Sequence, residues 1–248
     1  MPQKAWYQDW FNSPYYHKLY FERDSKEAAN FIKRLLKKLE PKPGSSMLDI
    51  ACGKGRHSVI LSESGYPVTG IDISVENIEF ASQFENPSLE FYQHDMRLPF
   101  RINYFNYVFN FFTSFGYFNT RREHDDTIRT IAGCLKEKGI LVIDYLNVHY
   151  AEENIIHNEE KKIGETSFTL LRWHDDDHFY KKIIIDDVNL TDQLVFTEKV
   201  AKFTIGDFTD MLSYQGLQVQ EVFGDYYLNK YDLNKTPRMI LIASKVKI

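Results

Sequence analysis

The chain has 248 residues, 43% hydrophobic and 26% charged, a balance typical of a folded globular protein rather than a disordered one. Lys and Arg total 30 against 35 Asp and Glu, which gives a formal net charge of -5. That charge excludes the basic surface of a general nucleic-acid binder. The length allows one large α/β domain, with or without an insertion.

The two cysteines, Cys52 and Cys134, match neither a disulfide framework nor a zinc-ligand spacing, which favours a reducing compartment. No apolar run is long enough to span a bilayer, and the opening MPQKAWYQDWF lacks the apolar core of a signal peptide. We therefore expect a cytoplasmic protein without a membrane partner.

The first two thirds of the chain alternate between helical and strand patterns. Apolar spacing predicts a helix over 24–39, which the segment PKPG at 41–44 ends. Strands are then expected at 46–51, 67–73, 88–93, 104–112 and 139–146, and helices at 57–64, 75–83 and 122–136. This alternation predicts a parallel sheet with helices on both faces.

After Asn147 the pattern changes. The β-like runs at 166–173, 178–190 and 193–204 follow one another with only polar turns between them, so we expect an antiparallel arrangement. A helix at 206–215 and strands at 216–223 and 238–246 then restore the α/β pattern.

We therefore expect residues 1–149 and 205–248 to form one α/β domain, with a helical cap over 1–44. Residues 150–204 would form an antiparallel insertion that covers the substrate or contacts a second copy.

The segment LDIACGKGRHS, residues 48–58, places Gly53 and Gly55 between a strand and a helix. Ligands of parallel sheets bind at the carboxyl ends of the strands, so this turn predicts a cofactor site. Asp72 ends the next strand, and its carboxylate suits the hydroxyls of a ribose. At this point NAD and other adenosine-bearing cofactors are equally compatible with the pattern.

Three features then favour an adenosine other than a dinucleotide. Ser58 stands where the dinucleotide fingerprint has its third glycine. Asp49 lies in the turn region, where it would repel a pyrophosphate but favour an ammonium or a bound water. Asp95 and Met96 follow the third strand and suit the amine and the ring face of an adenine.

With these segments in order, the chain resembles the class I S-adenosylmethionine-dependent methyltransferases. LDIACGKG resembles their first motif, although Ala51 replaces the first glycine of many members, and TGIDIS, HDMRLP and FNYVFNFFTSFGYF resemble the next three. The resemblance implies an α/β fold with a doubly wound, seven-stranded, mostly parallel sheet whose last strand is antiparallel, so that residues 1–149 and 205–248 would form a Rossmann-like cofactor-binding methyltransferase domain. Shorter stretches such as YYHKLYFERD are similar to small-molecule members of the glycine and nucleotide-sugar N-methyltransferase type.

The resemblance implies S-adenosylmethionine as the cofactor and a small molecule as the methyl acceptor. Asp49 and the turn after it would hold the methionine part, Asp72 the ribose, and Asp95 the adenine amine. Residues 114–118 would form a loop over the sulfonium. Arg23 suits the cofactor or substrate carboxylate and a surface salt bridge equally well. The residues expected at the cofactor are Tyr20, Arg23, Asp49, Ala51, Cys52, Gly53, Gly55, Asp72, Ile73, Asp95, Met96, Asn110 and Phe111.

Methyl transfer from a sulfonium is an in-line displacement, in which the protein supplies alignment and excludes water. A neutral amine acceptor needs only correct placement, whereas a hydroxyl acceptor also needs a general base. The candidates for a base are Tyr145, Asn147 and His149 near the carboxyl end of the fifth strand, together with His57. None has a partner that the sequence identifies, so transfer to nitrogen and to oxygen both stay open.

Two features of the insertion, the HDDDH segment and a set of aromatic residues, each allow more than one interpretation. We interpret HDDDH at 174–178 as a hairpin turn rather than a metal site. Trp173, Phe179, Tyr180 and Phe196 suit either a pocket cover or sheet packing, and exposed strand edges suit a homodimer. The alternatives to a methyltransferase are an NAD-dependent oxidoreductase and a protein that binds S-adenosylmethionine without catalysis.

Overall fold

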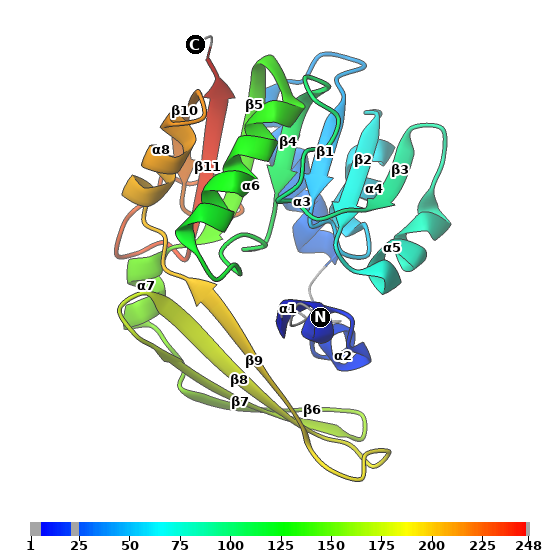
Figure 1. Ribbon diagram of the computed structural model, residues 1–248, viewed down its shortest axis with the longest axis vertical. Coiled ribbons are helices and arrows are strands. Elements are labelled where there is room, and N and C mark those ends of the chain that lie inside the picture. The colour runs from blue at the N-terminus through cyan, green and yellow to red at the C-terminus, as the bar shows by residue number, and fades with distance from the viewer. Residues whose placement is uncertain (1–5, 21–24, 247–248) are drawn as a thin grey trace.

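The computed structural model describes residues 6–20 and 25–246, which contain a seven-stranded sheet in the order β10-β11-β5-β4-β1-β2-β3 (Figure 1). The first five strands pair in parallel, and β11 is antiparallel to both of its neighbours. This confirms the predicted sheet with an antiparallel last strand. Its strands are β1 (Met47–Ile50), β2 (Val68–Asp72), β3 (Leu89–Gln93), β4 (Phe105–Asn110), β5 (Leu135–Leu146), β10 (Leu217–Phe223) and β11 (Arg238–Lys245).

Helices cover both faces of this sheet, and each face has its own apolar core. Residues of α6 and α8 pack on one face, and residues of α3 and α4 on the other. The helix starts follow local capping: the Thr120 hydroxyl accepts from the backbone N–H of Glu123 at the start of α6. The helices are α3 (Ser25–Leu39), α4 (Arg56–Glu63), α5 (Val75–Ala81) with the short 3₁₀ turn η1 (Ser82–Phe84), α6 (Arg121–Cys134) and α8 (Ile205–Ser213).

Residues 158–201 form a separate antiparallel sheet in the order β6-β7-β8-β9. Its strands are β6 (Asn158–Ile163), β7 (Thr166–His174), β8 (His178–Asp186) and β9 (Leu194–Ala201). The HDDDH segment makes the turn between β7 and β8, where Asp175 accepts from the backbone N–H of His178. The strand β6 was not predicted, because its sequence NEEKKI lacks an apolar alternation.

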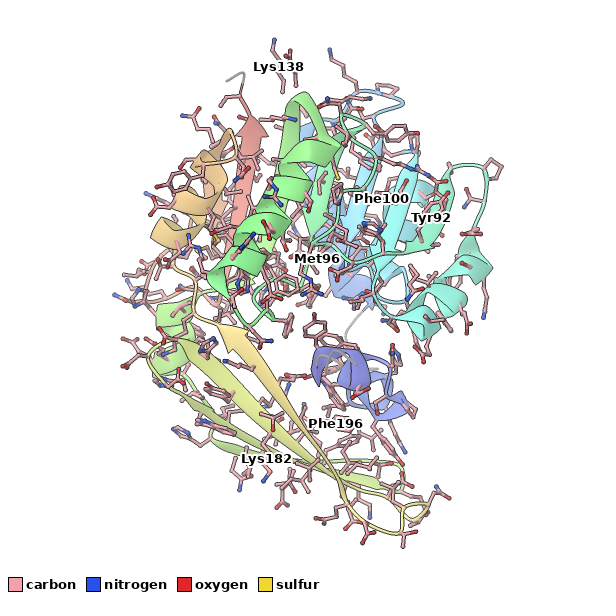
Figure 2. The ribbon with its side chains drawn as sticks, viewed as in Figure 1. Tyr92, Met96, Phe100, Lys138, Lys182 and Phe196 are labelled. Carbon is pink, nitrogen blue, oxygen red and sulfur yellow. The ribbon has the colours of Figure 1, made fainter. Side chains whose placement is uncertain are left out.

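A helical cap over 1–44 was expected, but three short helices were not predicted individually: α1 (Trp6–Phe11), α2 (Pro14–Tyr20) and α7 (Val148–Glu153). The first two pack on the four-stranded sheet, where Trp10 is fully buried and its ring centroid lies 4.8 Å from that of Phe196 (Figures 1 and 2). They therefore lie between this sheet and the carboxyl ends of the parallel strands (Figure 1). No helix within the described ranges is long and apolar enough to cross a bilayer.

Candidate functional site

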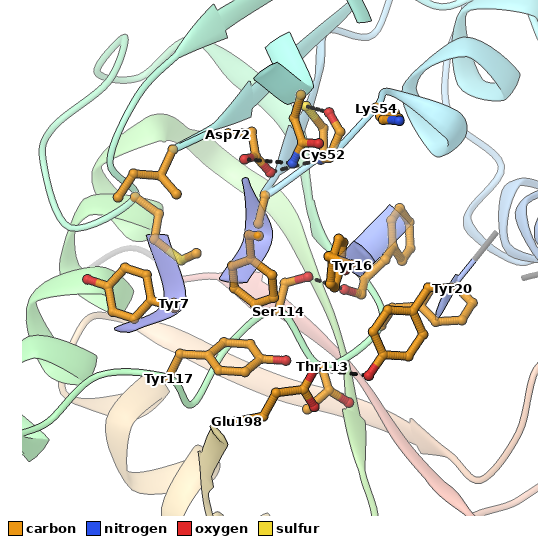
Figure 3. A pocket seen from close by; sticks show the side chains of 18 of the residues that line it. Tyr7, Tyr16, Tyr20, Cys52, Lys54, Asp72, Thr113, Ser114, Tyr117 and Glu198 are labelled. Atoms are coloured by element: carbon orange, nitrogen blue, oxygen red, sulfur yellow. Dashed lines mark hydrogen bonds between the residues drawn. The ribbon is translucent and has the colours of Figure 1, made fainter. Parts of the chain in front are cut away.

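A cavity of about 560 Å³ lies where the carboxyl ends of β1, β2 and β4 face α1, α2 and the four-stranded sheet (Figure 3). The parallel sheet contributes Ala51, Asp72 and Phe111, and the other sheet contributes Lys181 and Glu198. This volume is in the range of sites for small organic ligands. We call this cavity the inner chamber.

The glycine turn after β1 supplies one wall of the inner chamber. Gly53 has a φ of 56°, and its backbone N–H donates to Oδ2 of Asp72 at 2.9 Å. A Cβ at Gly53 would meet nothing within 4 Å, whereas a Cβ at Gly55 would lie 2.6 Å from the ring of Phe91. Gly53 therefore leaves room beside the chamber, and Gly55 allows the turn to pack closely on β3.

Asp72 is fixed at the end of β2 by the neighbouring backbone. Besides Gly53, the backbone N–H of Ser74 donates to its carboxylate at 2.8 Å. Its side chain is 8% exposed, and burial raises the pKa of this carboxyl. A rigid carboxylate at the rim of a cavity is suited to accept hydrogen bonds from a pair of ribose hydroxyls.

Three of the predicted cofactor residues, Asp49, Gly55 and Asn110, are not among the described residues that line the chamber. Asp49 is 1% exposed and accepts a hydrogen bond from the Ser58 hydroxyl at 2.6 Å. Burial raises its pKa to about 7. The Asn110 amide donates to the carbonyl of Ile50 at 3.1 Å. Asp49 and Asn110 thus support the turn from within the sheet.

Asp95 lines the chamber, but a neighbouring guanidinium already occupies its carboxylate. Nε of Arg97 lies 3.1 Å from both carboxylate oxygens, and Nη2 lies 2.7 Å from Oδ2. Arg97 also donates to Glu123 at 2.6 Å. An adenine amine at Asp95 would have to share the carboxylate with Arg97. This competition was not predicted from the motif HDMRLP.

Aromatic rings surround the middle of the chamber. Figure 3 shows Tyr7, Tyr20 and Tyr117 around one space, and Phe112 and Phe118 also belong to the lining. Aromatic faces attract cations such as an ammonium or a sulfonium. Of the other predicted residues, Ala51, Cys52, Ile73, Met96 and Phe111 line the chamber. Arg23 lies outside the described residues.

The lining fits S-adenosylmethionine in its chemistry. Asp72 offers a fixed carboxylate to the ribose, and Ile73 and Met96 offer apolar surface to the adenine ring. Beside them, the tyrosine and phenylalanine rings supply the electron-rich faces that a sulfonium requires.

Tyr145, Asn147 and His149, the candidate bases near the carboxyl end of β5, do not line the chamber in the part of the chain that the structure describes. Tyr145 is fully buried and its hydroxyl donates to the carbonyl of Ala201. The amide of Asn147 donates to three carbonyls of one loop, those of Asp232, Leu233 and Thr236. His57 does line the chamber, with its ring centroid 4.7 Å from that of Phe111.

A buried cluster that sequence reasoning missed forms the opposite wall. Lys181 on β8 and Glu198 on β9 are directly opposite in register, with 2.9 Å between Nζ and Oε2. The other oxygen of Glu198 accepts from Trp10 at 2.7 Å and from Tyr20 at 2.9 Å. Burial alone would raise the pKa of Glu198, but Lys181 and these donors lower it below its usual value. The carboxylate is therefore ionised and joins the insertion to α1 and α2.

A second buried ion pair supports the wall beside the turn. Asp144 on β5 is fully buried, and Nη2 of Arg238 lies 2.6 Å from its Oδ1. Arg238 lines the chamber and also donates to the Thr113 hydroxyl at 3.0 Å. The backbone N–H of Phe112 donates to the other oxygen of Asp144 at 2.9 Å. The pair thereby fixes the loop that follows β4.

Comparison with known proteins identifies the class. A family model described as "Methyltransferase domain" matches residues 20–222. A protein of Geobacillus sp. (strain WCH70), whose methyltransferase name is provisional, is 23% identical over 240 residues, 93% of this chain and 97% of its own. The dTDP-3-amino-3,4,6-trideoxy-alpha-D-glucopyranose N,N-dimethyltransferase of Streptomyces venezuelae is 29% identical over 123 residues, 49% of this chain and 51% of its own.

A solved structure shares the fold. The structure of an S-adenosylmethionine-bound amino pentose methyltransferase from Micromonospora echinaspora has a TM-score of 0.70 at 17% identity, and the match covers 94% of this chain and 98% of that one. Because the family model spans most of the chain, the protein belongs to this methyltransferase family. The resemblance to class I S-adenosylmethionine-dependent methyltransferases is thereby confirmed, and S-adenosylmethionine is the methyl donor of that class.

Proposed function

We propose that the protein transfers a methyl group from S-adenosylmethionine to a nitrogen atom of a small molecule held in the inner chamber. The observation that carries this proposal is that one cavity joins the glycine turn to the Lys181–Glu198 wall. The names of relatives support a nitrogen acceptor, because the Streptomyces venezuelae relative is an N,N-dimethyltransferase of an amino sugar.

In this proposal the cofactor lies along the carboxyl ends of β1 and β2. Asp72 accepts from the ribose hydroxyls, and the backbone from Ala51 to Gly53 faces the methionine part. Ile73 and Met96 pack on the adenine, whose amine shares the Asp95 carboxylate with Arg97. The cofactor supplies the methyl group, and the rings of Tyr7, Tyr20 and Tyr117 surround the transfer path and exclude water.

An acceptor amine enters opposite the turn, on the side of Lys181 and Glu198. A neutral amine needs placement and a dry surrounding but no strong base. The hydroxyl of Tyr145 and the amide of Asn147 are committed to backbone carbonyls, and of the four candidate bases only His57 lines the chamber in the described part of the chain, so base-assisted transfer to a hydroxyl would depend on His57. A homodimer and a role of the insertion in covering the acceptor stay part of the proposal.

The test is turnover of methyl-labelled S-adenosylmethionine with matched pairs of acceptors, read by mass spectrometry. Ethanolamine and glucosamine would be compared with ethylene glycol and glucose. We expect label in the amines. Label only in the hydroxyl compounds would contradict transfer to nitrogen. Cofactor binding without transfer to any member of a broad metabolite extract would favour the non-catalytic alternative.

A further inference from the structure

A second cavity of about 400 Å³ adjoins the inner chamber, and we call it the outer chamber. The two cavities share four lining residues: Leu146, Lys181, Glu198 and Val200. The rest of the outer chamber comes from α7, the segment after it, the strands β6, β7 and β8, and Pro237 just before β11. A molecule that enters the inner chamber past Lys181 and Glu198 can therefore extend into the outer one.

We propose that the outer chamber binds an uncharged apolar or aromatic end of the same acceptor whose nitrogen is methylated in the inner chamber. This inference rests on the proposed function and specifies the class of substrate. The acceptor is then an elongated amine: a nitrogen at one end, a polar group in the middle and an apolar body at the other end.

The walls of the outer chamber carry the apolar part of the argument. Ile155, Ile156 and Phe179 line it, and the side chain of Ile156 is 62% exposed at its edge. Preformed apolar walls of this kind favour burial of a ring or an alkyl body.

The charges in the outer chamber argue against an anionic end such as a phosphate. Nη2 of Arg172 lies 2.5 Å from Glu159, and Nη1 donates to the carbonyl of Ile156 at 3.2 Å. Glu198 lies beside the Lys181 ammonium at 2.9 Å. Each of these cations thus has a carboxylate next to it, and a bound dianion would have to compete with that carboxylate.

The boundary between the two chambers is polar, which explains why the middle of the acceptor should be polar. Oε1 of Glu198 accepts from Trp10 and Tyr20, and within the described part of the chain Oε2 accepts from Lys181 alone. A carboxylate oxygen offers two acceptor sites. A hydrogen-bond donor in the linker of the acceptor can therefore use Glu198 as it passes between the chambers.

Dansylcadaverine has the required form, with a primary amine, a sulfonamide N–H and an aromatic end, and cadaverine is its control without the aromatic end. Binding to the whole protein with S-adenosylhomocysteine present would be followed by dansyl emission and by calorimetry. We expect dansylcadaverine to bind at least ~10-fold tighter than cadaverine, with blue-shifted emission. Equal affinities would overturn the proposal.

Two variants locate the aromatic end. Ala151→Trp fills the outer chamber, and Ile156→Glu places a charge at its exposed edge. Each should weaken dansylcadaverine by ~10-fold and leave cadaverine unchanged, because only the former reaches the outer chamber. Glu153→Trp, on the exposed side of α7 and outside the lining, is the matched control and should change neither. If Ala151→Trp does not fold, Ile156→Glu still tests whether the aromatic end binds in the outer chamber.

Further arms separate the outcomes. Unchanged dansylcadaverine affinity in a folded Ile156→Glu variant would overturn the proposal. Displacement of the dye by the anionic nucleotide dTDP from the wild type, but not from this variant, would also overturn it, because the outer chamber would then bind an anionic end. Calorimetry with S-adenosylhomocysteine should give the same affinity in all variants. If the wild type does not bind S-adenosylhomocysteine at all, the result contradicts the proposed function instead.

Discussion

Lys181 and Glu198 face each other across β8 and β9 and form a largely buried ion pair, to which Trp10 and Tyr20 of the N-terminal helices also bind. The side chains of the pair are 17% and 13% exposed. One carboxylate therefore joins three parts of the molecule at the wall of the inner chamber. The stability of that wall therefore depends on the ion pair between Lys181 and Glu198.

Replacing Glu198 with alanine should lower the free energy of unfolding by about 3 kcal/mol, because it leaves the Lys181 ammonium largely buried without its carboxylate. Urea unfolding measures this. Glu221→Ala is the control, since the Lys38–Glu221 pair is 41% and 44% exposed and should contribute under about 1 kcal/mol. Similar losses for the two variants would show that burial of the pair has no special effect.

The two glycines of the turn should respond differently to alanine. Gly55→Ala forces a Cβ to within 2.6 Å of Phe91 at a φ of 80°, and should destabilise the fold by about 2 kcal/mol or more. Gly53→Ala meets open space in the fold and should cost about 1 kcal/mol of backbone strain.

The added methyl group of Gly53→Ala nevertheless lies where the cofactor is proposed to bind, so affinity for S-adenosylhomocysteine should fall at least ~10-fold. Thermal unfolding and calorimetry on both variants separate the effects. A Gly53→Ala variant that binds as tightly as the wild type would contradict the placement of the cofactor at this turn.

Asp72→Asn tests the ribose contact. Oδ2 of Asp72 accepts from the N–H of Gly53 and Oδ1 from that of Ser74, so an asparagine keeps only one of these bonds and also loses the charge-assisted hydrogen bonds to the ribose hydroxyls. We expect a ~10- to 100-fold loss of affinity for S-adenosylhomocysteine and a decrease of about 1–3 kcal/mol in the free energy of unfolding. Asp210→Asn, at an exposed position on α8, is the control and should have no effect on binding.

The stability of the protein should depend on pH through Asp49. Its pKa of about 7 lies above the usual value of the unfolded chain, so the folded state favours the protonated form, and this contribution is lost as pH rises through 7. Asp49→Asn should match the wild type near pH 4. It should gain relative stability of about 1.4 kcal/mol for each pH unit over which folded Asp49 stays protonated while its unfolded counterpart ionises.

The difference between variant and wild type is the quantity to measure by urea unfolding from pH 4 to 8. Burial lowers the pKa of His17 and His124 to about 4, so their protonation destabilises the folded protein as pH falls. This effect opposes that of Asp49, but it is the same in the wild type and in the variant. They cancel in the difference. A difference that does not change with pH would show that Asp49 is ionised throughout this range.

Most of the residues that the motifs singled out do lie together around the glycine turn, because they follow strands within one parallel sheet. Asp72 and Gly53 come together because β1 and β2 are neighbours, which alternation of strands and helices already indicates. The same reasoning identified the antiparallel runs of the insertion, including the turn at 174–178.

The opposite wall of the chamber, which contains Lys181 and Glu198, could not be predicted from local sequence patterns. Lys181 and Glu198 meet only because β8 and β9 adopt one register, and a shift of one residue would turn both side chains to the other face. The helices α1 and α2 are too short for a periodic signal, and α2 places Tyr20 at the chamber by packing on the insertion. Arg97 was visible in the motif, but its hold on Asp95 required the folded loop.

Calorimetric titration of the whole protein with S-adenosylhomocysteine, beside a parallel titration with NADH, directly tests whether the inner chamber is a site for S-adenosylmethionine. We expect one site per chain with micromolar or tighter affinity for S-adenosylhomocysteine and much weaker binding of NADH. No binding of S-adenosylhomocysteine at hundreds of micromolar, or tighter binding of NADH, would contradict it.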